Sequence, residues 1–169
     1  QFQTLRPYIV IAERVDSQDT MSQRAFPKDS LFAIQLKYEE GMVVDLNRAD
    51  TAELKCIPGI GTGLANMIVA YRSRLGGFYE VEQLQEIPHV GKELNKWFVI
   101  HADTLRKLHV NQAGLDKLRS HPYMNFYKAK AILEYRRKRG DIKGMAQLSL
   151  FEEFTESDLN KLAPYLSFD

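Results

Sequence analysis

Apolar residues follow one another at helical spacing in the middle of the chain, with polar residues between them. Intervals of three and four place these apolar side chains on one face of a helix that begins near Thr62. The residues of this stripe are Leu64, Met67, Ile68, Tyr71 and Leu75. Gly76 and Gly77 end the pattern, because glycine suits the left-handed conformation that commonly follows a helix.

Shorter helices are predicted on both sides of this one. Asp50 and Glu53 have the spacing of a capping box, which predicts a helix over residues 51–56. Similar short patterns predict helices over residues 80–86 and 92–98. Together these elements predict an all-α fold of short helices.

An internal repeat organises the chain. Residues 46–84 and 110–148 align without a gap when the sequence is shifted by 64 positions, and Asn47, for example, meets Asn111. Such a density of matches indicates one helical unit that is used twice. Arg72 also recurs, as Arg136, and a repeated contact with a carboxylate or a carbonyl explains that as readily as a contact with DNA.

The first residues resemble the last ones. TLRPYIVI, residues 4–11, is similar to KLAPYLSF, residues 161–168, so we expect a slice of a longer array that begins with the end of an earlier copy. Weak alternation over residues 31–38 suggests a short strand or an extended arm. The predicted organisation is a closing segment of a preceding repeat over 1–11, a linker and extended arm over 12–42, a first repeat over 43–105, and a degenerate second repeat over 106–169.

The segment IPGIG, residues 57–61, joins two of the predicted helices. Its glycines permit positive φ angles, and Ile60 is expected to point inward and anchor the turn. The helix that follows begins with backbone N–H groups that lack an intrahelical partner. These groups and the helix dipole favour an anion, so the segment is either a plain turn or a phosphate contact that carries no sequence information.

These residues resemble the helix-hairpin-helix DNA-binding motif, and most of all the ComEA-type competence DNA-receptor proteins. The resemblance rests on LNRAD, PGIG, Ala65, IVAYR, GGF and VEQL in that order, and on PHVG followed by Lys92 as a second hairpin. It implies a SAM-like, all-α fold of tandem helix-hairpin-helix repeats, to which the alternation over residues 31–38 adds an extended N-terminal arm. It also implies weak, sequence-independent binding of double-stranded DNA, no enzymatic activity, and a membrane-anchored, outward-facing location through a segment absent from this chain.

The resemblance indicates which residues contact phosphate. The phosphate-binding set is Pro58, Gly59, Ile60, Gly61, Thr62 and Gly63 in the first hairpin, and Val90, Gly91 and Lys92 in the second. The auxiliary basic set is Lys128, Arg136, Arg137, Lys138 and Arg139.

Several positions depart from the family pattern. No Lys or Arg follows the glycines over residues 62–66, and His89 stands where a glycine is expected. In the second copy Tyr123 replaces Gly59, and Asn125 replaces the next glycine; Asn tolerates the left-handed region, so that turn is expected to survive as a poor cradle. The last hairpin region, FEEFTESD, is acidic and should repel phosphate.

Composition weakens the case for strong DNA binding. The chain has 23 basic and 22 acidic residues, and strong nucleic-acid binders are usually more basic. The alternative is a structural or protein-interaction module that keeps the fold without DNA, with self-association through the N-terminal segment. The single Cys56 excludes an internal disulfide and a cysteine-ligated cluster, and the four histidines lack metal-ligand spacing. Seven aromatic residues are expected to pack in the core or between the repeats and not to stack on bases: Phe78, Tyr79, Trp97, Phe98, Tyr123, Phe126 and Tyr127.

Overall fold

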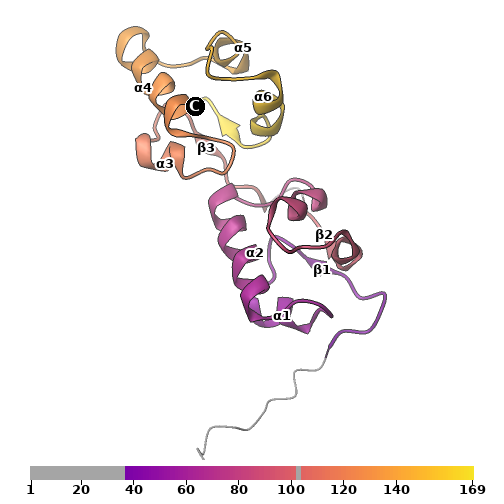
Figure 1. The fold of residues 1–169 in the computed structure, drawn as a ribbon. Coiled ribbons are helices and arrows are strands. Elements are labelled where there is room, and N and C mark those ends of the chain that lie inside the picture. Colours follow the sequence, from indigo (N-terminus) through magenta and orange to yellow (C-terminus); the bar gives the residue numbers. More distant parts are fainter. Residues whose placement is uncertain (1–36, 102–103) are drawn as a thin grey trace, which may run out of the picture. The chain divides into compact units, whose positions relative to one another are not determined.

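The computed structural model describes residues 37–101 and 104–169, and it is mostly helical, as the sequence predicted (Figure 1). The first repeat contains β1 (Val44–Asp45), α1 (Thr51–Cys56), α2 (Thr62–Leu75), η2 (Val81–Glu86), η3 (Lys92–Trp97) and β2 (Phe98–Val99). The second contains β3 (Leu108–His109), α3 (Leu115–Arg119), α4 (Phe126–Arg139), α5 (Met145–Leu148), α6 (Glu156–Leu162) and β4 (Leu166–Ser167). Here η marks a 3-10 helix. The predicted closing segment 1–11 and nearly all of the predicted arm lie outside the described residues.

The capping residues explain where the helices begin and end. Asp50 accepts a 2.8 Å hydrogen bond from the Glu53 backbone at the start of α1, as the spacing predicted. Gly76 ends α2 at φ +90°, and a Cβ there would lie 2.6 Å from the Arg106 carbonyl oxygen. No helix among the described residues is long and apolar enough to span a membrane.

Each repeat is closed by a short parallel strand pair and has its own apolar core. Val44 of β1 pairs with Phe98 of β2, and Leu108 of β3 pairs with Leu166 of β4. The first core includes Leu46, Leu54, Ala65, Ile68, Leu75, Phe78 and Leu84, and the second includes Val110, Leu118, Ala129, Ile132, Ile142, Leu148 and Leu162. Within the predicted stripe of α2, Met67 is 37% exposed and does not belong to the core.

The aromatic residues divide between core and surface. Phe78, Trp97 and Phe98 are buried, as expected from the sequence. Tyr123 packs between the repeats, where its hydroxyl donates to Glu86, whereas Tyr79, Phe126 and Tyr127 are exposed, so core packing is wrong for these three. Phe126 and Tyr127 begin α4 and contact each other edge to face.

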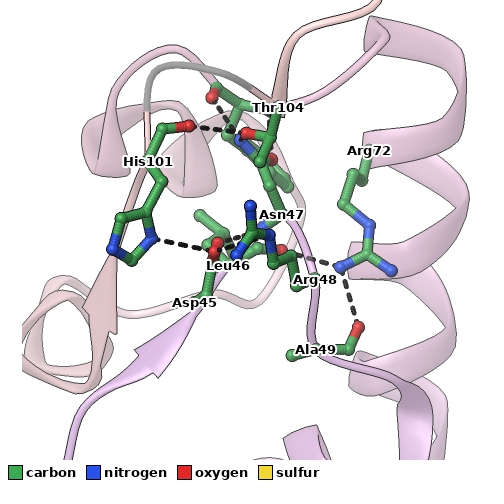
Figure 2. Close-up of polar contacts among 9 residues, drawn as sticks. Asp45, Leu46, Asn47, Arg48, Ala49, Arg72, His101 and Thr104 are labelled. Atoms are coloured by element: carbon green, nitrogen blue, oxygen red, sulfur yellow. Dashed lines mark hydrogen bonds and ion pairs between the residues drawn. The ribbon is translucent and has the colours of Figure 1, made fainter.

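Asn47 holds the first repeat together (Figure 2). Its side-chain oxygen accepts from the Phe78 N–H at 2.7 Å, and its Nδ2 donates to the Phe78 carbonyl at 2.8 Å and to Thr104 Oγ1 at 2.7 Å. Asn111 makes the same paired contact with Ile142 and also donates to the Phe168 carbonyl. The matched asparagines therefore satisfy backbone groups that would otherwise be buried without a partner.

Arg72 also acts inside the repeat. Its Nη1 donates to the carbonyls of Leu46 and Ala49 at 2.7 and 2.8 Å (Figure 2). Arg136 repeats this contact with the Ala113 carbonyl at 2.6 Å. The carbonyl interpretation of this repeated arginine is therefore confirmed.

A polar cluster joins the two repeats. Glu86 of the first repeat accepts hydrogen bonds from Tyr71 and from Tyr123, and it pairs with Lys161 at 3.1 Å. Burial alone would raise the pKa of the Glu86 carboxyl, but these three hydrogen bonds outweigh it and lower the pKa below its ordinary value. Burial raises the pKa of the neighbouring Tyr165 to about 12.

His121 lies in the same contact and is buried against aromatic rings. The imidazole is 5.5 Å from the Tyr123 ring and 5.1 Å from the Tyr165 ring, and its Nδ1 accepts from the Tyr123 N–H. Burial lowers the pKa of His121 to about 4, with further lowering by the charges of Arg74 and Lys117. The folded chain therefore holds this imidazole neutral at every pH near neutrality.

Replacing Asn47 by Ala should lower the free energy of unfolding by about 2–4 kcal/mol, because the Phe78 N–H and carbonyl lose their partners inside the core. Urea denaturation followed by circular dichroism measures this. Asn66→Ala, an exposed position of α2, is the control and should change stability by less than about 0.5 kcal/mol. Equal effects of the two substitutions would show that the hydrogen bonds of Asn47 do not hold the first repeat together.

Stability should also fall as the pH is lowered through the His121 window. The unfolded chain binds a proton near pH 6.5, whereas the folded chain does not until about pH 4, so protons favour the unfolded state between these values. The loss should reach on the order of 3 kcal/mol by pH 4. Denaturation at several pH values, compared with His121→Gln, isolates this component; His109→Gln, an exposed histidine, should retain it. Parallel pH curves for wild type and His121→Gln would contradict the assignment.

Candidate nucleic-acid interface

Hairpin 1, residues 57–61, is a tight turn between α1 and α2. Gly59 has φ +88°, a value that favours glycine. Ile60 is buried, as predicted, and its N–H is bonded to the Ile57 carbonyl at 3.2 Å. Pro58 has no N–H, so Pro58 and Ile60 shape the turn and offer no free amide to a ligand.

The start of α2 is open. Gly61 is its N-cap residue and provides no side-chain cap, while its carbonyl accepts from the Ala65 N–H at 2.9 Å. Gly61, Thr62 and Gly63 are exposed, and a Cβ added at either glycine would meet no atom within 4 Å. Gly61 also has φ −97°, which any residue adopts, so the fold does not require glycine there.

The first amides of α2 therefore remain available. Within the described part of the chain, the backbone N–H groups of Gly61, Thr62 and Gly63 have no hydrogen-bond partner. The helix dipole adds about 0.3–1 kcal/mol of attraction for an anion at this end. Three exposed amides and an absent side chain form a surface that a phosphate oxygen can approach closely.

Hairpin 2, residues 87–91, has the same turn. His89 takes φ +67° at the position equivalent to Gly59, so the two turns of the first repeat share the left-handed conformation. Val90 is buried and bonded to the Ile87 carbonyl at 3.3 Å. Gly91 caps η3 without a side chain, and Lys92 is exposed beside it.

Glu93 reduces the value of hairpin 2 as a phosphate site. Its carboxylate lies over Gly91, so close that a Cβ there would be 2.0 Å from Oε1. A negative charge at the N-terminus of η3 repels phosphate. It also occupies the end of the helix dipole that would otherwise attract a phosphate. Hairpin 2 nevertheless lies beside hairpin 1, because Leu94 Cδ2 is 3.5 Å from the Cβ position of Gly59.

Hairpin 3, residues 121–125, is closed to an anion. Asn125 has φ −119° and not the left-handed conformation that the sequence suggested; it is the N-cap of α4, and its side chain accepts from the Lys128 N–H at 2.8 Å. Tyr123 turns toward the first repeat, where its hydroxyl bonds to Gln83 and Glu86. The matched positions in the two repeats therefore build one open and one occupied helix start.

Hairpin 4, residues 151–155, is also capped by its own side chains. Thr155 and Asp158 form a capping box at the start of α6. Asp158 also pairs with Lys128 at 2.6 Å; burial would raise the pKa of this carboxyl, but the hydrogen bonds from Lys128 and Thr155 lower it to about 2. Lys128 is itself buried, and its charge pairs within the second repeat. It is therefore not accessible to DNA, which corrects its place in the predicted auxiliary basic set.

The remaining auxiliary residues lie apart from hairpin 1. Arg136 is directed at the Ala113 carbonyl, which corrects its placement in a DNA-facing set. Arg137, Lys138 and Arg139 are exposed in the last turn of α4, where cations suit the helix dipole. The second repeat contacts Arg74 at the C-terminal end of α2, about 20 Å along the helix from hairpin 1.

Two residues near hairpin 1 and hairpin 2 carried no recognisable signal in the sequence. Lys37 lies 20 positions before the turn, yet its ammonium bonds to carbonyls of α1 and hairpin 1. Glu93 is an ordinary acidic residue in the first turn of a short helix. Only the folded chain shows that one supplies positive charge and the other negative charge to these turns.

Comparison with known proteins agrees with this geometry. The family model for the helix-hairpin-helix motif matches twice, over residues 39–96 and 104–167. Endonuclease/exonuclease/phosphatase family domain-containing protein 1 of Danio rerio is 28% identical over 141 residues, which cover 70% of this chain and 26% of that protein, so this chain spans about a quarter of that relative. No solved structure matches the chain. Such motifs generally bind DNA, and because the two matches cover most of the sequence, this chain belongs to the helix-hairpin-helix family.

Proposed function

We propose that this chain binds double-stranded DNA without sequence preference, through phosphate contacts at hairpin 1. The observation that carries the proposal is the open start of α2, where Gly61 leaves free amides. Its counterpart α4 has the same length but is capped by Asn125. Thr62 and Gly63 complete the proposed cradle, and Lys92 of hairpin 2 supplies a neighbouring charge.

Weak binding follows from the chemistry of this cradle. Backbone amides contact phosphate oxygens, which are the same at every base pair, so the contact positions the duplex without identifying its sequence. One hairpin reaches one or two phosphates, and the nearly balanced charge of the chain adds little long-range attraction.

We further propose that the chain acts by binding rather than by catalysis. In the part of the chain that the structure describes, no three His, Cys, Asp or Glu side chains are grouped to hold a metal ion. The resemblance to ComEA-type proteins extends the proposal to DNA uptake, where a weak hold that ignores sequence lets any duplex be bound and released.

The second repeat supports an alternative for its own surface. Its hairpins are capped by Asn125 and Thr155, and Phe126 and Tyr127 lie exposed at the start of α4. A structural or protein-interaction role fits such a surface better than a phosphate contact does. The predicted self-association through residues 1–11 concerns a segment outside the described residues.

Fluorescence anisotropy with a labelled duplex over a KCl series tests the DNA proposal. The slope of log K against log salt should be about −1 to −2, as for one or two phosphates. Gly61→Glu should weaken binding by about fivefold or more at low salt, because a carboxylate then occupies the cradle. Gly114→Glu is the matched control, since Gly114 is also an exposed N-cap glycine with open space around it.

Three results of this experiment would contradict the proposal. They are undetectable binding at low salt, equal effects of the two glutamate substitutions, and cleavage of the duplex when it is recovered from a sample containing Mg²⁺. The first two would remove hairpin 1 as the contact, and the third would remove the non-catalytic role.

Glu93→Gln should strengthen DNA binding by about two- to fourfold at low salt, because it removes the carboxylate that lies over Gly91. Glu82→Gln, an exposed position of η2, removes the same charge elsewhere in the first repeat and is the control. The same anisotropy assay measures both, and the gain should vanish in high salt. An equal gain from both substitutions would mean that only net charge matters.

A further inference from the structure

A cavity of about 270 Å³ lies beside the C-terminal half of α2. Its polar lining combines Arg72 and Ser73 of α2 with Thr104 and Arg106 from the segment that precedes β3. Arg72 lies ten residues after Thr62, where α2 begins, which is about 15 Å along the helix axis. The cavity is therefore separate from the proposed phosphate cradle at hairpin 1.

Arg72 is anchored on one side of its guanidinium and has unused donors on the other. Its Nη1 donates to the carbonyls of Leu46 and Ala49 (Figure 2). A guanidinium has five N–H donors, and within the described residues the Nε and Nη2 donors of Arg72 have no hydrogen-bond partner. The carbonyl contacts thus fix a side chain that lines the cavity with donors still available.

Gly76 lets the chain carry Arg106 close to Arg72. The Arg106 N–H donates to the Gly76 carbonyl at 2.8 Å, and a Cβ at Gly76 would lie 2.6 Å from the Arg106 carbonyl oxygen. The Arg106 Nη2 donates to the Ser73 carbonyl at 3.4 Å. Burial is the main cause that lowers the pKa of Arg72; the Asp45 carboxylate raises this pKa, and the charge of Arg106 lowers it.

The charges of the two arginines are not paired. Among residues 37–101 and 104–169, neither Arg72 nor Arg106 forms an ion pair. The Asp45 carboxylate instead contacts His101 at 2.9 Å and Arg48 at 3.5 Å. Two like charges that line one cavity repel each other, and an anion between them would replace this repulsion by two attractions.

The donors of the cavity match a phosphate monoester. Such a group carries a charge of about −1.5 to −2 at pH 7 and has three acceptor oxygens, so it balances two guanidinium groups. Arginine also presents paired N–H donors that fit two oxygens of one phosphate. The Ser73 hydroxyl lines the same cavity, makes no hydrogen bond in the part of the chain that the structure describes, and can donate to the third oxygen. A phosphodiester of the DNA backbone carries only one charge and fits two arginines less well.

The second repeat does not have this combination of residues. Asp141 stands at the position of Gly77, and Phe168 stands at that of Thr104. A carboxylate and an apolar ring at these positions disfavour an anion. The contact of Arg72 with backbone carbonyls recurs at Arg136 and belongs to the fold, whereas the other donors of the cavity are specific to the first repeat.

We propose that Arg72, Ser73 and Arg106 form a binding site for a phosphate monoester dianion, supplied either as inorganic phosphate or as the terminal phosphate of a nucleic-acid strand. The two arginines hold two oxygens of the anion, and the Ser73 hydroxyl donates to the third. This site goes beyond the proposed contact of hairpin 1 with DNA and does not depend on it.

An NMR titration of ¹⁵N-labelled protein with sodium phosphate, at an ionic strength held constant with NaCl, tests the site. The Nε–Hε signals of Arg72 and Arg106 and the amide signal of Gly76 should move and saturate. Arg106→Gln should lower the affinity by about tenfold or more, because hydrogen bonds to a charged group are lost. Its exposed side chain makes it the suitable variant, since Arg72 also holds carbonyls of the fold.

Lys143→Gln is the control for this titration. It removes one exposed positive charge in the second repeat and should change the affinity by less than about twofold. Shifts that do not saturate, or equal affinities of wild type and Arg106→Gln, would overturn the proposal.

A second measurement identifies the source of the phosphate. Duplexes that end in a 5′-phosphate or in a 5′-hydroxyl are compared by fluorescence anisotropy. If the phosphorylated duplex binds about threefold more tightly or better, and Arg106→Gln removes this difference, the site takes a strand terminus. If the two duplexes bind equally while the phosphate titration saturates, the site takes free phosphate.

An equal loss of affinity for both duplexes in Arg106→Gln would show that the cavity takes backbone phosphodiesters, and it would overturn the assignment to a dianion. If the wild type binds neither duplex, the DNA-binding function fails, and the phosphate titration alone then decides whether the cavity is an anion site.

Discussion

A single side chain, Asn47, is the constraint on which the first repeat depends. The helices around it have 6 to 14 residues, and helices this short are marginal alone in water, so they need tertiary contacts. Asn47 provides such contacts by pairing with both backbone groups of Phe78 and by reaching Thr104. With that closure in place, α2 has a fixed direction and its N-terminal amides have a fixed position at the surface. Asn111 provides the same closure in the second repeat, which is why two copies with different surfaces keep one fold.

The N-cap residue decides which copy remains open to a ligand. α2 and α4 have equal length and matched positions, but one starts at glycine and the other at an asparagine that bonds to the helix amide. The preceding turns differ as well, because Gly59 has a positive φ angle and its counterpart Tyr123 does not; His89 shows that hairpin 2 shares the conformation of hairpin 1. Gly59 is therefore explained by the fold, whereas Gly61 has no structural requirement for glycine, and it is Gly61 that points to a ligand.

Several basic side chains of the described residues make contacts within the chain. Lys128 pairs with Asp158, Arg136 serves the Ala113 carbonyl, and Lys37 serves hairpin 1. The basic residues that the sequence suggested as auxiliary contacts are therefore partly engaged elsewhere, and the proposed contact with DNA depends on the backbone dipoles of hairpin 1. Such a contact acts over a short range and does not depend on base sequence, which agrees with weak, non-specific binding of a duplex.

The sequence by itself determined the repeat, the helices, the caps at Asp50 and Gly76 and the inward position of Ile60, because these follow from local spacing and from residue preferences along one segment. It also identified hairpin 1. Only the tertiary structure decided which charges reach solvent, because burial and pairing join residues distant in the sequence, as Lys128 and Asp158 show. It alone placed Lys37 at the turn and Glu93 over Gly91. Local residue preferences therefore determine the fold of each repeat. The electrostatics of the site depend on tertiary contacts, which form only when the chain folds.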